Sequence, residues 1–170
     1  MLVVRMITRS KWEPKSEDQI GEIPADAVTG DLKTQGNALS FLRSRSNTGG
    51  DFEDVILAIA AGRDKIDKVE IVWFDKDELI NDDLNLVQTD GITPIRDLIK
   101  LHADVPLLDY TRLGKVADKI ASALASDQYW RVTRSRVKKL LIAAVIRQRL
   151  EIEHLNEKIQ TEIKKVLNPD

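Results

Sequence analysis

The chain has 170 residues, 42% of which are hydrophobic, and it contains no cysteine. A chain of this length can bury a hydrophobic core without disulfides, and without cysteine it has no thiolate metal centre, iron–sulfur cluster or cysteine nucleophile. No stretch has the length and apolarity of a signal peptide or a membrane span, so we expect a cytoplasmic protein with no membrane partner.

Acidic and basic side chains are unevenly distributed along the chain. Residues 1–109 carry 13 Lys and Arg against 21 Asp and Glu, a net charge of −8, whereas residues 110–170 carry 13 against 7, a net charge of +6. The two parts either neutralise each other when they pack, or the basic part faces an anionic partner such as nucleic acid. We expect an acidic α+β part over 1–109 and a basic helical part over 110–170, either as one continuous domain or as two.

The first part begins with two expected strands separated by a long irregular segment. Residues 2–7 and 38–45 have the pattern of strands, whereas residues 10–38 lose periodicity around two prolines and three glycines, apart from one short helix over about 25–32. We expect this segment to be ordered by contacts with the rest of the protein or with a partner.

The remainder of the first part predicts a helix, a strand, an acidic hairpin and a second helix, over 51–61, 69–74, 77–91 and 93–105. Apolar residues on both faces of the expected strand indicate a covered strand in the middle of a sheet. The second helix is predicted from Thr93 as its N-cap and Pro94 at its first position, where a missing N–H costs nothing.

The second part predicts three helices over about 113–124, 133–150 and 152–167. The middle helix contains the apolar run LLIAAVI, so we expect it to be covered on nearly all sides. Leu141, Val145 and Trp73 should be deeply buried. The fold class is therefore α+β: a small mixed or antiparallel sheet with covering helices, followed by a C-terminal three-helix segment packed against it.

No motif in the chain predicts a catalytic, cofactor or metal site. The glycine pair at 49–50 precedes a helix, as in a phosphate-binding loop, but the carboxylates of Asp51, Glu53 and Asp54 in the first helical turn would repel a phosphate. The two histidines lie on different expected helices, with no second imidazole at ligand spacing. His102 is expected to be half-buried and hydrogen-bonded on its helix.

Two residues suggest an enzyme. Arg5 on the first expected strand and Ser40 in LSFLRS resemble the arginine and serine positions of ADP-ribosyltransferase folds, in which such residues help to hold NAD. The resemblance implies an NAD-dependent transferase-like enzyme. The sequence assigns the catalytic glutamate of such an enzyme to neither Glu53 nor Glu70, and we claim no family from this pair.

The segment Asp127–Lys139 concentrates positive charge beside two aromatic rings. Its candidate contacts for a partner or for nucleic acid are Tyr129, Trp130, Arg131, Arg134, Arg136, Lys138 and Lys139. Cations neutralise phosphates and flat rings stack on bases, so the pattern is typical of nucleic-acid binding. The alternative is that the rings pack in the core while the cations meet the acidic residues of the first part.

From these observations we expect a non-enzymatic macromolecular interaction protein, a small subunit or accessory factor that binds another protein or a second copy of itself. Nucleic-acid binding through backbone contacts of residues 131–139 is the alternative function, because the apolar middle helix leaves no polar face to read bases. The NAD-dependent transferase is the third. We expect no cofactor and no metal ion.

Overall fold

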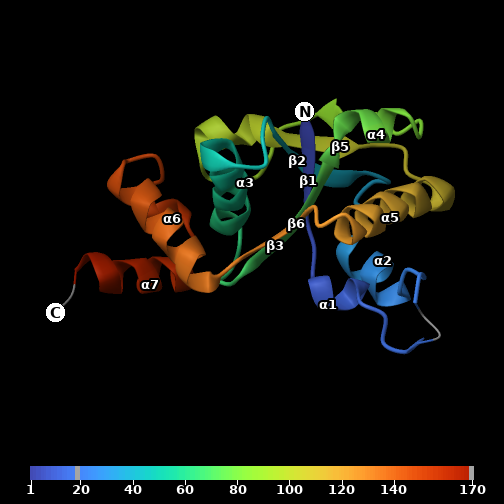
Figure 1. Ribbon diagram of the computed structural model, residues 1–170. Helices are drawn as coiled ribbons and strands as arrows, with labels where there is room; N and C mark the ends of the chain where they lie inside the picture. The colour runs from blue at the N-terminus through green and yellow to red at the C-terminus, as the bar shows by residue number, and fades with distance from the viewer. Residues whose placement is uncertain (18–19, 169–170) are drawn as a thin grey trace.

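In the described part of the chain, six antiparallel strands form one sheet (Figure 1). In the computed structural model, which describes residues 1–17 and 20–168, the strands are β1 (Leu2–Met6), β2 (Leu39–Ser44), β3 (Val69–Asp75), β4 (Val87–Gln88), β5 (His102–Val105) and β6 (Tyr129–Val132). Their order is β4-β5-β2-β1-β3-β6, and all neighbours pair antiparallel. The α+β class with an antiparallel sheet is confirmed.

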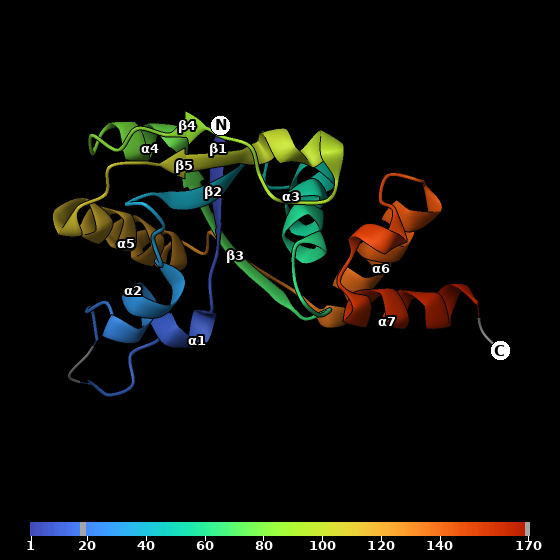
Figure 2. The ribbon, with the colours of Figure 1, turned by 180° about the vertical axis from the view of Figure 1, so that it is seen from behind.

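Helices cover both faces of this sheet (Figure 2). They are α1 (Arg9–Trp12), α2 (Ala25–Asp31), α3 (Gly49–Ala61), α4 (Lys76–Ile80), α5 (Tyr110–Ala125), α6 (Arg134–Ile146) and α7 (Glu157–Leu167), with the 3-10 helices η2 (Arg96–Leu101) and η3 (Ile152–His154). One face carries α3, η2, α6 and α7, and the other carries α1, α2, α4 and α5. The protein therefore has three layers.

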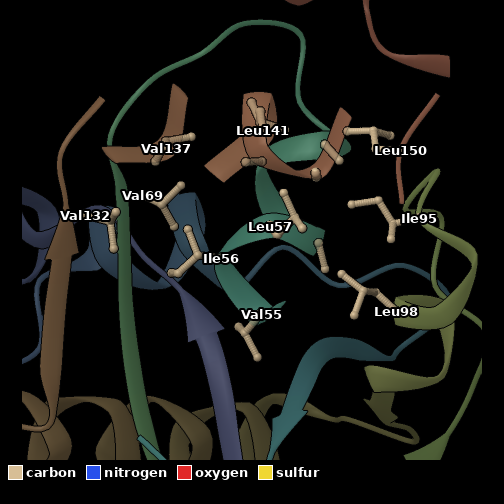
Figure 3. Close-up of a cluster of buried hydrophobic side chains, with 14 of the residues drawn as sticks. Val55, Ile56, Leu57, Val69, Ile95, Leu98, Val132, Val137, Leu141 and Leu150 are labelled. Atoms are coloured by element: carbon tan, nitrogen blue, oxygen red, sulfur yellow. The ribbon is translucent and has the colours of Figure 1, made fainter. Parts of the chain in front are cut away.

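Each face of the sheet has its own hydrophobic core, because successive side chains of a strand point to opposite faces. The first core, part of which is drawn in Figure 3, joins the sheet to α3, α6 and α7. Ile56 of α3 and Leu141 of α6 are fully buried in it. The second core joins the opposite face to α5, with Phe74 and Ile120 among its buried members.

Several elements lie where the sequence predicted them, namely β1, β2, β3, α2, α3 and α5. β3 is buried on both faces, but it is the second strand from the edge and not the middle of the sheet. The predicted deep burial is confirmed for Leu141 and is wrong for Trp73 and Val145, which are only partly buried.

The apolar helix α6 is not covered on nearly all sides. It buries Val137, Leu141 and Ala144 along one face, whereas Ile146 is 64% exposed. The reason is that α6 belongs to an outer layer, so only the side turned toward α3, α7 and the sheet is covered.

The acidic hairpin predicted over 77–91 is wrong. Residues after β3 form α4, which begins with a capping box in which the backbone N–H of Asp75 donates to the Glu78 carboxylate at 3.1 Å. The two-residue strand β4 then pairs with β5 and not with β3. Local capping thus favours a helical turn where the acidic residues suggested a hairpin.

The helix predicted from Thr93 is also wrong. This segment contains only η2, and from His102 onward the chain forms β5, which pairs with both β2 and β4. Buried Ala103 and Val105 alternate with half-buried His102 and Asp104, a period of two that spans only four residues. His102 is half-buried and hydrogen-bonded, as expected, but on a strand.

The C-terminal segment packs against the sheet from both sides. α5 lies on one face, while α6 and α7 lie on the other (Figure 1). Between them the chain enters the sheet as β6, a strand that the sequence pattern did not predict. A left-handed residue, Asp127 with φ of 54°, follows the end of α5 and redirects the chain into this strand.

One carboxylate, that of Asp31, joins the two helices of the irregular segment over 10–38. Asp31, at the end of α2, accepts the backbone N–H of Thr8 at 2.6 Å and the indole N–H of Trp12 at 3.0 Å. It also forms an ion pair with Lys11 at 3.0 Å. These contacts hold α1, which was not predicted, against α2, which was; residues 18–19 lie outside the described part.

Candidate functional site at the edge of the sheet

The last strand, β6, presents an open edge. The backbone N–H of Trp73 on β3 donates to the carbonyl of Gln128 at 3.2 Å. Hydrogen-bonded positions of an antiparallel pair recur at every second residue, so Trp130 also bonds toward β3. The N–H and C=O groups of Tyr129 and Arg131 therefore point away from the sheet.

These outward N–H and C=O groups have no backbone hydrogen-bond partner in the described part of the chain. Among residues 1–17 and 20–168, neither Tyr129 nor Arg131 makes a backbone hydrogen bond to another segment. Figure 1 shows β6 beside β3, where the chain passes from α5 to α6. A free strand edge of this kind is a template for an added strand.

A row of three aromatic rings, from β6, α3 and β3, lies on the side of β6 that faces α3. Trp130 stacks on Phe52 with ring centres 5.4 Å apart and planes within 6°, and Phe52 meets Trp73 edge-on at 5.1 Å. Phe52 is buried and Trp130 is 36% exposed, so this stacked pair leads from the core to the surface. A hollow of about 430 Å³ lies along it and reaches residues 47–49 at the start of α3. We call this hollow the aromatic groove.

On the other side of β6, a buried carboxylate is held by two donors. The hydroxyl of Tyr129 donates to Glu70 at 2.7 Å, and Lys68 pairs with Glu70 at 2.9 Å. Burial and the bond to Glu70 raise the pKa of Tyr129 to about 12. Burial alone would raise the pKa of Glu70, but the hydrogen bonds from Lys68 and Tyr129 outweigh it and lower that pKa.

This second side has an excess of positive charge. Arg131 lies 4.0 Å from Glu70 with its side chain 60% exposed. Arg9 lies over the ring of Tyr129 at 4.8 Å and pairs with Glu13 at 3.3 Å. This side of β6 therefore carries three cations and two carboxylates, namely Arg9, Lys68 and Arg131 with Glu13 and Glu70.

Three further cations of the predicted cluster are ion-paired. Arg134 and Lys138 contact Glu162 of α7 at 2.5 and 3.9 Å. Arg136 pairs with Glu53 of α3. The Glu53 pair joins the basic part of the chain to the acidic part, and the Glu162 pairs join two helices of the basic part.

The seven predicted contact residues thus lie on one strand and the helix after it, but they point in different directions. Tyr129 and Trp130 are neighbours on a strand, so their rings lie on opposite faces of the sheet and do not form one stacking platform. Arg131 lies on the side of Tyr129. Lys139 is exposed on α6 and has no ion pair with any described residue.

The start of α3 is occupied by ion pairs and not by an evident anion site. Asp51, which was predicted to repel a phosphate, pairs with Arg45 at 2.7 Å. Asp54 pairs with Arg149 at 2.6 Å, and its hydrogen bond is the first cause that raises the pKa of Arg149. The sequence pattern carried no signal for the second pair, because its partners are 95 residues apart.

Arg5 is engaged within the fold. Its Nη1 and Nη2 donate to the backbone carbonyls of Ser40 and Asp31, each at 2.5 Å. Burial lowers the pKa of Arg5 to about 10. The two residues that resemble ADP-ribosyltransferase positions are therefore in contact, but the guanidinium is used to join β1, β2 and α2.

Among the described residues, no group of three His, Asp or Glu side chains is arranged to hold a metal ion. No described helix is long and apolar enough to span a membrane. Comparisons of the chain with protein-family models, curated proteins and solved structures find no match. Function must therefore be inferred from the geometry of this chain.

Proposed function

We propose that this protein is a non-enzymatic interaction module that binds an extended segment of another protein along the outer edge of β6. The observation that carries the proposal is the pair of outward-facing residues, Tyr129 and Arg131, beside the aromatic groove. Each offers one N–H and one C=O, so an added strand gains up to four backbone hydrogen bonds. Such strand addition supplies affinity from the main chain and specificity from alternate side chains.

The two sides of β6 indicate what the partner carries. A residue of the added strand opposite Trp130 lies on the side of the aromatic groove, where an apolar side chain fits. Its two neighbours lie on the side of Arg131, where the positive excess favours carboxylates. The preferred partner segment therefore reads acidic, apolar, acidic.

Nucleic-acid binding is the weaker alternative. Arg134, Arg136 and Lys138 already have carboxylate partners, and phosphates would have to compete with these. Arg131 and Lys139 are the cations of the cluster with the least compensation. Two such contacts give only a shallow salt dependence.

Selection from a random peptide display library on the immobilised protein tests the proposal. The decisive variant is Arg131→Pro, because proline lacks the outward N–H and leaves the bonds between β6 and β3 intact. Arg131→Ala is the matched control, since it loses the same side chain and keeps the N–H. We expect enriched acidic–apolar–acidic peptides that bind the wild type and Arg131→Ala but not Arg131→Pro.

Two outcomes would overturn the proposal. One is a library that yields no enriched peptide. The other is a set of peptides that bind Arg131→Pro as tightly as Arg131→Ala, with both variants folded by circular dichroism. Either would mean that the outer edge of β6 does not accept a strand.

A further inference from the structure

A second hollow lies on the face of the sheet that α3 covers only in part. Its volume is about 330 Å³, and it opens between the C-terminal end of α3 and the loop at 91–93. Val4, Met6 and Leu42 of β1 and β2 line it. Met6 is 42% exposed although β1 is an interior strand, so this part of the sheet is open to solvent. We call it the sheet-face hollow.

A hydrogen-bond network borders one end of the sheet-face hollow. The hydroxyls of Ser40 and Thr89 donate to the two carboxylate oxygens of Asp104, at 2.9 and 2.7 Å. The Thr89 oxygen also lies 2.8 Å from Nδ1 of His102. Thr89 has only one hydroxyl hydrogen, so the hydrogen in this second contact belongs to the imidazole.

The direction of these bonds determines what the hollow offers to a ligand. With the hydrogen on Nδ1, neutral His102 has a free lone pair on Nε2. Ser40 has turned its hydrogen toward Asp104, so its oxygen is left with lone pairs. Ser40 and His102 both line the hollow, and both present acceptors. A polar group bound here must therefore donate.

Charges near the sheet-face hollow restrict the ligand further. The Asp104 side chain is 22% exposed, and among the described residues its ion-pair contact is with Nε2 of His102, 3.9 Å from Oδ1; a neutral imidazole leaves the carboxylate charge uncompensated, so an anion is repelled. Arg63 lines the hollow as well, and its positive charge disfavours a cation. The sheet-face hollow therefore favours a neutral ligand that carries a hydrogen-bond donor.

We infer that the sheet-face hollow binds a small neutral aromatic molecule that carries one N–H or O–H donor. The apolar floor suits a flat ring, and the thioether of Met6 makes favourable contacts with aromatic rings. The volume is at the lower end of ligand pockets, which span about 300–1,000 Å³. The donor reaches Nε2 of His102 or the Ser40 oxygen. This site is independent of strand addition at β6.

Indole and benzothiophene form a matched pair of probes, because they have nearly the same shape and only indole has an N–H. We would titrate both into the full chain and follow the methyl signal of Met6 and the imidazole nitrogens of His102 by NMR. Indole should shift both signals and bind at least tenfold more tightly than benzothiophene, although benzothiophene is the more apolar.

The His102→Phe variant keeps a ring but removes the acceptor, and should bring the two affinities within about twofold. His154→Phe is the control, because His154 is exposed on η3 and should leave the preference unchanged. The inference is overturned if the wild type binds both probes equally, if the Met6 signal does not move, or if indole does not bind up to its solubility limit. The comparison of indole with benzothiophene on the wild-type chain tests the inference even if His102→Phe fails to fold.

Discussion

Reversing the charges of Arg134 and Lys138 to glutamate is expected to destabilise the protein rather than to abolish a nucleic-acid contact. Both cations contact Glu162 of α7, at 2.5 and 3.9 Å, with side-chain exposures of 56% and 28%. Partly exposed pairs of this kind contribute about 0.2–1 kcal/mol each. The double variant loses two attractions and gains two repulsions around Glu162, for a total of about 1–2 kcal/mol.

Thermal unfolding followed by circular dichroism measures this loss. For a chain of this size, about 1–2 kcal/mol lowers the Tm by about 2–8 °C. Adding Glu162→Lys to the double variant should recover most of the loss, because it restores opposite charges across the same helix pair. Lys139→Glu is the control, since Lys139 has no ion pair with a described residue, and its Tm should hardly change.

Titration of fluorescent RNA and DNA at low salt completes the test. Were all five cations of 131–139 to contact phosphates, the log–log salt slope would be roughly −3.5 on single strands and −4.5 on duplex. We expect no such binding. Tight, salt-sensitive binding that the double reversal removes without lowering the Tm would show instead that the cluster binds nucleic acid and does not stabilise the fold.

Burial of Leu141, ionisation of Tyr129 and exposure of the segment 10–38 can each be measured separately. Leu141→Ala should lower the free energy of unfolding, measured by urea denaturation, by about 2–5 kcal/mol. Ile146→Ala, at the exposed end of α6, is the control and should lower it by less than about 0.5 kcal/mol. A loss below about 1 kcal/mol for Leu141→Ala would contradict the burial of Leu141. Tyr129 should ionise near pH 12 in an absorbance titration, and Tyr129→Phe should remove this step. Because the pKa is raised from 10.0 to about 12, the contribution of Tyr129 to stability is present below about pH 10 and is lost as the pH rises through 12. Ionisation of Tyr129 near pH 10 in the folded protein would contradict this prediction. Trypsin should cut first at exposed Lys15, and Asp31→Ala should open further cuts within 10–38; first cleavage in α7 would show that this segment is not the most accessible.

Sequence periodicity predicted the elements whose pattern is local and long. α5 has sixteen residues with one apolar face, and β3 has apolar residues on both faces, so both can be predicted without knowledge of their neighbours. β5 and β6 have four residues each and are defined by their pairing with β2 and β3. Such pairing joins residues far apart in the chain, so a short window of sequence carries almost no signal for it.

The same limit applies to the candidate site. Composition drew attention to Tyr129, Trp130 and the cations that follow, and these residues do flank the open edge of β6. Their ion-pair partners were not predictable, because Arg136 and Glu53 are 83 residues apart. The opposite directions of the two rings follow from strand geometry, and therefore depended on a strand that the sequence had not predicted.

Hydrogen exchange of the β6 amides, measured by NMR on the free protein and with a selected peptide, tests strand addition most directly. We expect slow exchange at Trp130 and Val132 in both states, because these amides bond to β3. Tyr129 and Arg131 should exchange fast in the free protein and at least tenfold more slowly with bound peptide. Protection of both amides before any peptide is added, or fast exchange of both at saturating peptide, would contradict strand addition at β6.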